Sequence, residues 1–592
     1  MISVSTEADG DDDPALRPRR LSGVSEGQSE FHFSPRPNRA GEISWRTWSA
    51  EAFERARAED KPILLAISAV WCHWCHVMDE TTYSSQPVID LINREFVPIR
   101  VDNDVRPDIN QRYNMGGWPT TAFLTPQGDV LTGATYLPPD QMADALGRVG
   151  SYYRTRKPEI VAAVLEGRRR AGAAVAASAG SLDPGLVDRT LGSVETAYDE
   201  QYGGFGNAPK FPQTDAIALL AEQSILKAEP RLMEMARHTL SQMAGGGTYD
   251  HVEGGFFRYS TTQDWSVPHF EKMLEDHGGL VAALALTGQA AILDDAVRYL
   301  DTVLRDRETG LYAGSQDADE EYYAGDLEGR RRLSAPYVDR RVYAAWNCDL
   351  AVAYLEADAR LGRPRLRESA GRLLERLFAD HYVPGAGLRH MSLPDESGGQ
   401  GELGGQLGDQ AWGLWAAARA AAAGLGDAWK VRAMELADHL QDGYGDPELG
   451  GYFDHSGNDE LGRLQERIKP LAENSIAAIG LTELDALLGD PERRLRERAR
   501  RALESVAALP RRYGIMAAVF ARALDRVLRE PVKVTTTDEV LSQAAVAAYP
   551  YAVIERSGDD TAVICIGTTC LAPTRSVEEL TEKLGQAVAA RA

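Results

Sequence analysis

The sequence predicts a multi-domain protein with an N-terminal α/β domain, a long all-α segment and a small C-terminal α/β segment. An apolar run at 62–67 leads directly into a stretch with two cysteines at 71–76, as a strand leads into a helix. Turns that combine glycine with an aromatic residue recur between about residues 200 and 455. Short apolar runs alternate with helical stretches again after about residue 530. A chain of 592 residues is long enough for several domains.

The elements of the first domain follow a strand–helix–strand order that ends in a hairpin. Periodicity and turn residues predict, in chain order, a helix from about Ala50 to Asp60, a strand at 62–67, a helix that begins at the cysteines, a helix at Pro87–Glu95, a strand at Phe96–Asp102, and a strand at Thr120–Leu124 followed by a turn at 126–129. Pro119 stands directly before the last of these strands.

Cys72 and Cys75 are three positions apart, so both belong to the first turn of a helix. Unpaired N–H groups and the helix dipole favour a thiolate there, and the thiolate is the form that attacks disulfides. We therefore predict a dithiol/disulfide centre. A redox-inactive domain and a metal site completed by a flanking histidine are the alternatives. Zinc prefers four ligands and no second cysteine or histidine pair stands nearby, so no metal and no cofactor are expected. His73 between the thiols can stabilise the thiolate and raise the reduction potential.

This order of elements resembles a thioredoxin fold over roughly residues 45–150. The resemblance implies that Pro119 is in the cis form, packs against the cysteine pair and offers a backbone contact to the substrate. It adds Pro119 to the catalytic candidates Cys72 and Cys75.

Composition limits the partners. The net charge of −24 argues against nucleic acid and anionic membranes as partners. An acidic chain rich in Arg and poor in Lys is typical of a salt-adapted, halophile-like host. Five cysteines suit a reducing cytoplasm, and no apolar run reaches 18 residues, so we expect a cytoplasmic protein. Residues 1–40 are polar and are expected to be disordered.

The middle of the chain predicts stacked helical hairpins. The Gly-aromatic turns recur every 50 to 80 residues or so, enough for two helices each. Such pairs could close into an (α/α) toroid with the turns at one end; alternatively, the turns are only helix C-caps plugged by an aromatic ring. They stand at Tyr202–Phe205, Gly254–Phe257, Gly310–Tyr312, Gly387–Leu388 and Gly450–Phe453.

Polar and aromatic side chains cluster near these turns. In a toroid they would converge on one cavity, where carboxylates and histidines suit acid–base work on a sugar. Pro268 is expected to start a helix that places His269, Lys272 and Asp276 on one face. A solvated rim with helix caps, for example at Asp317, is the alternative. The cavity candidates are His251, Arg258, Trp265, His269, Glu271, Lys272, Asp276, Asp317, Asp319, Trp346, Asn347 and Glu473.

Together these segments resemble the thioredoxin-domain family that includes the spermatogenesis-associated thioredoxin-like proteins. The matching segments are Glu59–Ile63, Cys72–Met78, Gly117–Pro119, Tyr202–Pro212, Gly254–Tyr259, Trp265–Asp276, Gln316–Asp319, Trp346–Asn347, Gly450–Phe453 and the pair Cys565 and Cys570. The resemblance implies a six-hairpin (α/α)6 toroid similar to N-acylglucosamine 2-epimerases and glycoside hydrolases. We expect a thioredoxin-like domain at 41–165, the toroid at 180–528 and the α/β segment at 529–592.

Three functions follow as hypotheses. The first is a thiol-disulfide oxidoreductase or redox sensor that acts on a protein disulfide or a redox partner. The second is a sugar epimerase or glycoside hydrolase that works in the toroid cavity on a sugar ligand. The third is a non-enzymatic scaffold. Cys565 and Cys570 are secondary redox candidates that could relay electrons to the first pair, or else two small core residues.

Overall fold

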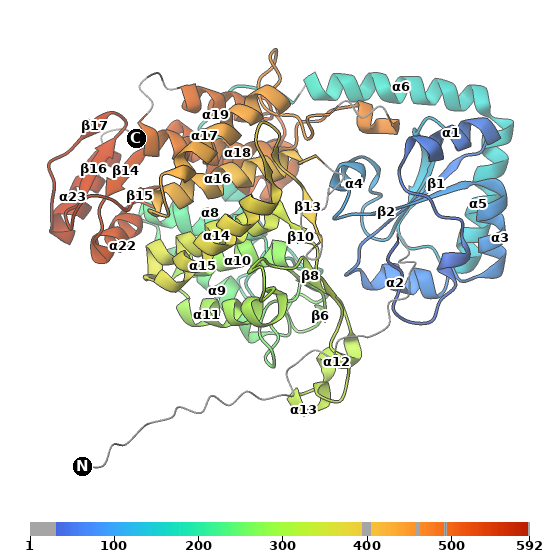
Figure 1. The fold of residues 1–592 in the computed structure, drawn as a ribbon, viewed down its shortest axis with the longest axis horizontal. Coiled ribbons are helices and arrows are strands. Elements are labelled where there is room, and N and C mark those ends of the chain that lie inside the picture. The colour runs from blue at the N-terminus through green and yellow to red at the C-terminus, as the bar shows by residue number, and fades with distance from the viewer. Residues whose placement is uncertain are drawn as a thin grey trace.

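The computed structural model describes residues 31–176, 178–393, 404–457, 461–489, 492 and 494–589. Figure 1 shows three parts in a row: the N-terminal domain at one end, a broad helical body in the middle and the C-terminal α/β segment at the other end. The fold class predicted from the sequence is confirmed. Residues 1–30 of the tail expected to be disordered lie outside the described residues.

The N-terminal domain is built on a four-stranded sheet in the order β2-β1-β3-β4. β1 pairs in parallel with β2 and antiparallel with β3, and β3 pairs antiparallel with β4. The strands are β1 (Ile63–Ser68), β2 (Val97–Asp102), β3 (Thr120–Leu124) and β4 (Val130–Ala134). The helices are α1 (Ala50–Glu59), α2 (His73–Glu80), α3 (Gln86–Glu95), α4 (Pro107–Tyr113), α5 (Pro139–Thr155) and α6 (Lys157–Ala176). This is the thioredoxin arrangement.

Residues 31–40 pack on this domain rather than belonging to a disordered tail. Ser34 is buried and donates its backbone N–H to the Asp79 carboxylate, and Ala40 is fully buried. Asp79 in turn forms an ion pair with buried Arg100 of β2. The domain therefore begins earlier than residue 41. The Trp118–Pro119 peptide bond is cis, as the resemblance implied.

The helical body is a closed ring. Within the described residues six inner helices contact one another in sequence, and the last of them also contacts the first. These are α8 (Thr214–Lys227), α10 (Leu274–Thr287), α14 (Ala344–Leu361), α16 (Leu407–Ala422), α18 (Leu471–Leu488) and α21 (Ala518–Leu528). Each packs against an outer helix, namely α9 (Pro230–Gly245), α11 (Ala290–Tyr299), α15 (Pro364–His381), α17 (Ala428–His439), α19 (Arg494–Glu504) or, for α21, α7 (Gly185–Ala197). The body is an (α/α)6 toroid.

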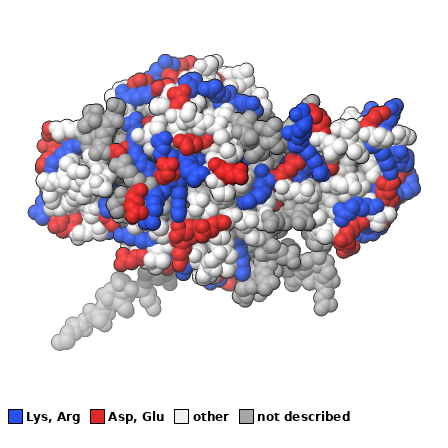
Figure 2. Space-filling view, turned by 90° about the horizontal axis from the view of Figure 1, so that it is seen from above, with Lys and Arg blue, Asp and Glu red and all other residues white. Residues whose placement is uncertain are grey.

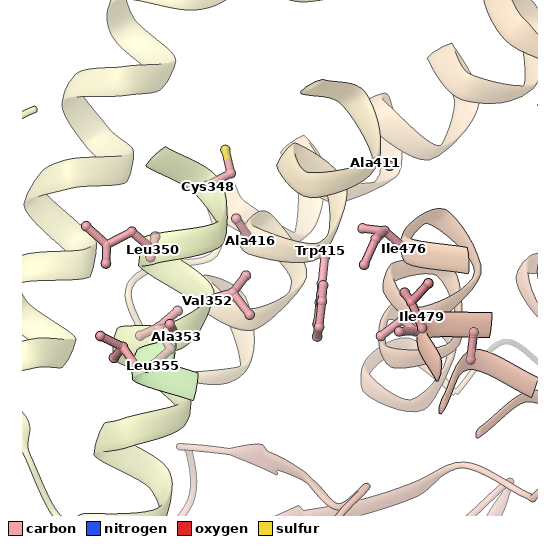
Figure 3. Close-up of a cluster of buried hydrophobic side chains, with 14 of the residues drawn as sticks. Cys348, Leu350, Val352, Ala353, Leu355, Ala411, Trp415, Ala416, Ile476 and Ile479 are labelled. Atoms are coloured by element: carbon pink, nitrogen blue, oxygen red, sulfur yellow. The ribbon is translucent and has the colours of Figure 1, made fainter. Parts of the chain in front are cut away.

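The inner helices pack through small and branched apolar side chains. Figure 3 shows Val352 of α14, Trp415 and Ala416 of α16 and Ile479 of α18 meeting between neighbouring helices of the ring. Alanine is frequent on these helices, which lets their backbones come close. Since each inner helix is covered by two inner neighbours and an outer one, apolar residues surround it on most sides.

The Gly-aromatic turns all lie between an outer helix and the next inner helix, so they stand at one end of the ring, as expected. A buried polar side chain at the start of the inner helix accepts the backbone N–H of the turn. The pairs are His277 with Phe256, Asn347 with Tyr312, Gln410 with Leu388 and Asn474 with Tyr452. At Gly255, φ is 80° and an added Cβ would lie 2.5 Å from the Tyr299 ring, so only glycine fits.

Buried Lys–Asp pairs repeat at three of these turns. Each lysine forms an ion pair with the aspartate that opens the turn and also donates to a glycine carbonyl within it. The pairs are Lys210 with Asp199, Lys272 with Asp250 and Lys469 with Asp446. The repetition shows that these lysines hold the turns.

The segment after Pro268 does not start a helix, which corrects the sequence-based expectation. Pro268–His269 is strand β6 and pairs with β5 (Tyr259–Ser260); Lys272–Met273 is strand β7 and pairs with β8 (Ser315–Gln316). Helix α10 begins only at Leu274. The partner strands supply backbone hydrogen bonds that the local pattern could not reveal.

Shorter elements complete the toroid, and one of them, η2, belongs to the N-terminal domain. They are β9 (Val338–Asp339), β10 (Val342–Tyr343), β11 (Tyr382–Val383), β12 (Gly387–Leu388), β13 (Met391–Ser392), α12 (Glu320–Ala324), α13 (Leu327–Arg330), α20 (Pro510–Tyr513), the 3-10 turns η2 (Ala40–Glu42), η5 (Gly462–Gln465) and η6 (Gly514–Ala517), and the π-helical ends η3 (Leu300–Leu304) and η4 (Leu440–Tyr444).

The C-terminal segment is a small α/β unit with strand order β15-β14-β16-β17. It contains β14 (Val532–Thr535), α22 (Glu539–Ala548), β15 (Val553–Glu555), β16 (Val563–Ile566), β17 (Thr569–Cys570) and α23 (Val577–Ala589). A disulfide joins Cys565 of β16 to Cys570 of β17.

Acidic and basic side chains are interspersed on the face that Figure 2 shows, rather than gathered in one basic or acidic field. Among the described residues, we find no helix with the length and apolar character needed to cross a membrane.

Candidate functional site

Cys72 and Cys75 form a disulfide at the start of α2, with their Cα atoms 5.2 Å apart. Cys72 is the N-cap residue, and its sulfur accepts the backbone N–H of Cys75. The apolar strand β1 carries the chain to this point, and the helix start directs N–H groups at the sulfur. Such a position stabilises a thiolate when the pair is reduced.

The toroid covers this disulfide. Cys72 is 4% exposed and Cys75 2% exposed, and both belong to an apolar cluster that includes Met273 of β7 and against which Trp346 of α14 packs. The Arg258 guanidinium lies 4.2 Å from the centre of the Trp71 ring. The sulfur pair therefore faces the helical body rather than open solvent.

Three histidine–carboxylate pairs surround the disulfide, and two of them join the domains. His73 of α2 lies 2.8 Å from Glu320, and His76 lies 3.7 Å from Asp317. The third pair, His269 and Glu271, belongs to the toroid, with 2.7 Å between His269 Nδ1 and the carboxylate. The rings of His73 and His269 meet edge to face, 6.0 Å apart.

These pairs differ in protonation. The hydrogen bond to Glu320 raises the pKa of His73, and the same bond lowers the pKa of Glu320 to about 2. Burial lowers the pKa of His76 to about 3, and burial raises the pKa of Asp317 to about 8. At neutral pH, His76 is thus uncharged and Asp317 protonated, whereas His73 tends to carry a positive charge beside Cys72.

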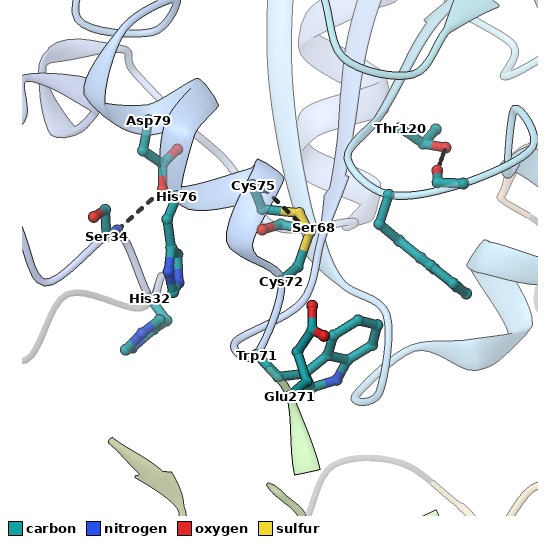
Figure 4. The surroundings of a disulfide bond; sticks show 12 residues. His32, Ser34, Ser68, Trp71, Cys72, Cys75, His76, Asp79, Thr120 and Glu271 are labelled. Atoms are coloured by element: carbon teal, nitrogen blue, oxygen red, sulfur yellow. Dashed lines mark hydrogen bonds between the residues drawn. A yellow bond between two sulfur atoms is a disulfide. The ribbon is translucent and has the colours of Figure 1, made fainter. Parts of the chain in front are cut away.

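Glu271 is the carboxylate that faces the sulfur atoms. In Figure 4 its side chain rises from below toward the disulfide, beside Trp71, while His76 and Asp79 lie on the other side of α2. Glu271 is 2% exposed, and its carboxylate is held by His269.

The thioredoxin-like domain caps the end of the ring where the inner helices begin. Arg112 of α4 forms a buried ion pair with Asp454, and Gln111 donates to Glu473 in the first turn of α18. His390 hydrogen-bonds to the backbone oxygen of Asp104. The cap thereby encloses the side chains at the start of the inner helices.

Carboxyl groups gather below this cap. Glu275 and Asp276 open α10, Asp349 is in α14 and Glu473 in α18. Burial raises the pKa of all four, that of Asp276 to about 7. Glu275 is nevertheless exposed to solvent. Asp276, Asp349 and Glu473 are half-buried, so this region is only partly open to solvent.

Several sequence candidates lie close to this region: Arg258, His269, Glu271, Asp276, Asp317, Trp346 and Glu473. Others hold the scaffold. His251 is exposed and bonded to the Gly246 oxygen, and Trp265 is fully buried with its indole N–H on the Tyr202 oxygen. Lys272 and Asn347 hold turns, and Asp319 caps α12.

Sequence reasoning missed Glu275, Asp349, Glu320, His76 and Asp104. Glu275 stands beside the candidate Asp276, and Asp349 two positions after Asn347, so their place at the start of an inner helix was the available signal. Glu320 and His76 gave no such signal because their pairs join distant segments. Asp104 accepts the indole N–H of Trp71 at 2.7 Å.

Metal ligands do not assemble here. In the described parts of the chain, no group of three or more His, Cys, Asp or Glu side chains has the geometry to hold a metal ion. The histidines are each engaged with one carboxylate instead.

Cys565 and Cys570 lie at the opposite end of the molecule from α2 (Figure 1), so electrons cannot pass directly between the two pairs within one chain. Their alternative interpretation as small core residues is also wrong, because Cys570 is exposed and Cys565 is half-buried. The remaining cysteine, Cys348, is buried and free.

The N-terminal domain is similar to a family of known proteins. Residues 33–166 match the family model Thioredox_DsbH, described as a protein of unknown function, DUF255. These residues are similar to the domain that this model describes. Human spermatogenesis-associated protein 20 is 36% identical over 310 residues, which are 47% of this chain and 39% of the human protein. The chain thus spans about two fifths of that relative.

Two solved structures align with more than half of the chain. A D-mannose isomerase aligns with a TM-score of 0.46 and 11% identity, covering 58% of this chain and 96% of the isomerase. The cellobiose 2-epimerase of Spirochaeta thermophila aligns with a TM-score of 0.45 and 20% identity, covering 61% of this chain and 96% of the epimerase.

Proposed function

We propose that this protein is a thiol–disulfide oxidoreductase whose Cys72–Cys75 pair exchanges electrons with disulfides at the junction of the two domains. The observation that carries the proposal is the position of Cys72 as N-cap of α2, next to a histidine whose pKa is raised. Helix N–H groups favour the attacking thiolate, and a raised pKa of the neighbouring histidine acts in the same direction.

The cover over the sulfur pair favours small substrates. With Met273 and Trp346 packed on the cysteines, a folded protein cannot bring a disulfide into line with Cys72 unless the domains separate. A low-molecular-weight disulfide needs far less room. We therefore propose a small-molecule disulfide as the substrate, and a protein disulfide only as a slower one.

The test compares two substrates on the full chain, with dithiothreitol as the reductant. We expect reduction of bis(2-hydroxyethyl) disulfide, slower reduction of insulin, and loss of both in Cys72→Ser. The Cys565→Ser, Cys570→Ser double variant is the matched control and should keep wild-type rates. Equal rates for wild type and Cys72→Ser would refute the proposal.

A second function is favoured by the carboxyl groups below the cap. Asp276, with its pKa raised to about 7, can hold or release a proton near neutrality beside Glu275, as acid–base chemistry on a sugar requires. We propose a sugar as the ligand of this space. A thermal-shift series with monosaccharides, disaccharides and amino sugars tests it: a stabilising sugar should lose its effect in Asp276→Asn and keep it in Cys72→Ser. No shift with any sugar would count against it.

A cytoplasmic, salt-adapted origin belongs to the same set of proposals. It rests on the acidic composition alone, and cell fractionation would test the location.

A further inference from the structure

We propose that Glu271, a toroid residue, is the proton acceptor for the Cys72 thiol, so that the two domains together make one redox site. This inference rests on the proposed oxidoreductase function. Its basis is placement: the carboxylate is buried, and it points at the sulfur pair from the opposite domain (Figure 4).

A thiol buried at an interface needs a neighbour that takes its proton. Solvent reaches Cys72 poorly, since the residue is 4% exposed, so hydroxide and buffer bases have little access. The strand that leads to the pair supplies no acid or base, because Ile63–Ser68 carries only apolar side chains and one serine. The candidate acceptors are therefore the histidines of α2, Asp104, which already accepts the indole N–H of Trp71, and the carboxylates of the domain that covers the pair.

The other ionisable groups nearby are unsuited to this task. His73 is held by Glu320, and this hydrogen bond raises the pKa of His73. His76 and Asp317 pair with each other on the side of α2 away from Cys72 (Figure 4 shows this place for His76). Glu271 remains as an acceptor with a clear direction toward the sulfur.

His269 makes this carboxylate usable. An isolated carboxylate beside a thiol would repel the thiolate and slow its formation. The imidazole of His269 lies 2.7 Å from the Glu271 carboxylate and can donate a hydrogen bond to it, so the carboxylate is not isolated. Stacking of His269 on Tyr259, with ring centres 4.8 Å apart, fixes the imidazole in this position. The Glu271 carboxylate is thus held in one direction, toward the sulfur pair.

The proton and the electrons move in two steps. Glu271 takes the proton of the reduced Cys72, whose thiolate attacks one sulfur of the substrate disulfide; the substrate S–S bond breaks, and the first thiolate leaves with the proton. Cys75 then loses its proton and attacks the Cys72 sulfur, which releases the second substrate thiol and forms the Cys72–Cys75 disulfide. Two electrons pass to the substrate, and an external dithiol reduces the protein again.

The experiment measures the rate of bis(2-hydroxyethyl) disulfide reduction between pH 6 and 9 in wild type, Glu271→Gln and Glu271→Asp. If Glu271 accepts the proton, the rate of Glu271→Gln at pH 7 should be about a hundredfold below that of wild type. This factor is the lower end of the rate enhancement that a positioned base contributes. The loss should shrink as the pH rises, because a larger fraction of the Cys72 thiol is then ionised before the substrate arrives. Asp, which is shorter but basic, should retain more activity than the isosteric Gln.

Other charged and titratable groups around Glu271 also affect the dependence of the rate on pH. They are His73 of α2, Arg258, Tyr259, His269, Asp276 of α10 and Asp317 after β8. The matched control is Glu320→Gln, which alters a second interface carboxylate that is bonded to His73. Glu320→Gln should change the apparent pKa of the Cys72 thiol. In its background, Glu271→Asp should still react faster than Glu271→Gln.

The outcomes separate the two ideas. A faster reaction in Glu271→Gln than in wild type would show that the carboxylate only repels the thiolate. A rate in Glu271→Gln equal to or above that in Glu271→Asp would show a structural role. Either result overturns this inference, while the oxidoreductase function stands. Absence of any Cys72-dependent reduction in the wild type would overturn both.

Discussion

The guanidinium of Arg112 in the thioredoxin-like domain lies 2.7 Å from the carboxylate of Asp454 in the toroid, and both side chains are nearly inaccessible to solvent. Arg112 also donates to the backbone oxygens of Arg463 and Glu466. A buried charge with this many partners is costly to leave unpaired. The contact therefore fixes how the domain sits on the ring.

Replacing Arg112 with Met should destabilise the docked arrangement by about 3–5 kcal/mol, because the Asp454 carboxylate stays buried without its partner. Urea denaturation and protease cleavage between the domains would measure this. The control is Arg148→Met, which removes an exposed ion pair with Asp144 and should cost less than about 1 kcal/mol. Equal effects of the two changes would contradict the expectation.

The His73–Glu320 pair should stabilise the interface in a defined pH window. The pKa of His73 is raised. The contribution of the charged histidine to the free energy of unfolding is therefore complete below about pH 6.5 and is lost as the pH rises through the raised pKa. The pKa of Glu320 is lowered to about 2, so its contribution is present above the ordinary value and lost as the pH falls toward 2. His73→Asn should therefore lower the unfolding free energy most between about pH 5 and 6.5.

The effect of His73→Asn should stay below about 1 kcal/mol, because Glu320 is half exposed and solvent screens the pair. Denaturation curves at pH 5.5 and 8.5 would measure it. A difference between variant and wild type that is the same at both pH values would exclude the ion pair as its cause.

His390 should make stability fall at alkaline pH. Burial opposes the charge on His390, but the neighbouring Asp409 carboxylate outweighs it and raises the pKa of His390 to about 9. The charged form therefore stabilises the fold fully below about pH 6.5, and this contribution disappears as the pH rises through 9. The free energy of unfolding should fall by at most about 3 kcal/mol between about pH 6.5 and 9.

Substituting His390→Gln should flatten the dependence of the unfolding free energy on pH between 6.5 and 9.5. The matched control is His251→Gln, which alters an exposed histidine and should leave the slope unchanged. A wild-type slope retained in His390→Gln would mean that other groups cause it.

Gly278 leaves room for Asp349. A Cβ at Gly278 would lie 2.6 Å from the Asp349 Cγ, too close for contact. Gly278→Ala should therefore destabilise the toroid by about 1–3 kcal/mol through overpacking. The cost should vanish when Asp349→Ala is added, because the carboxylate is gone, and a double-mutant cycle measures this coupling. Gly147→Ala, where nothing lies within 4 Å, is the control and should be neutral or stabilising. Additive effects of Gly278→Ala and Asp349→Ala would contradict the clash.

The fold could be predicted where the signal is local. Cys72, Pro119 and the Gly-aromatic turns follow from neighbouring residues, because a helix start, a proline before a strand and a glycine with positive φ are decided within a few positions. The C-terminal strands and helices were likewise predictable from their periodicity.

The site could be predicted only in part, because its geometry depends on distant segments. His269 and Lys272 were expected on one helix face, but pairing with Tyr259 and Gln316 makes their segments strands and sends the two side chains to different places. Glu271 meets Cys72 across almost 200 positions of sequence. No local pattern reveals that its side chain points toward the disulfide of another domain.

The closure of α21 on α7 and α8 has a consequence for synthesis of the chain. The first hairpin meets its final neighbour only when residues 518–528 have left the ribosome, roughly 15 to 60 s after α8 at typical elongation rates. During that interval the apolar side of α8 that α21 later covers stays open to water. A nascent toroid should therefore bind a chaperone until its last hairpin arrives, whereas the thioredoxin-like domain, made first, can fold without waiting.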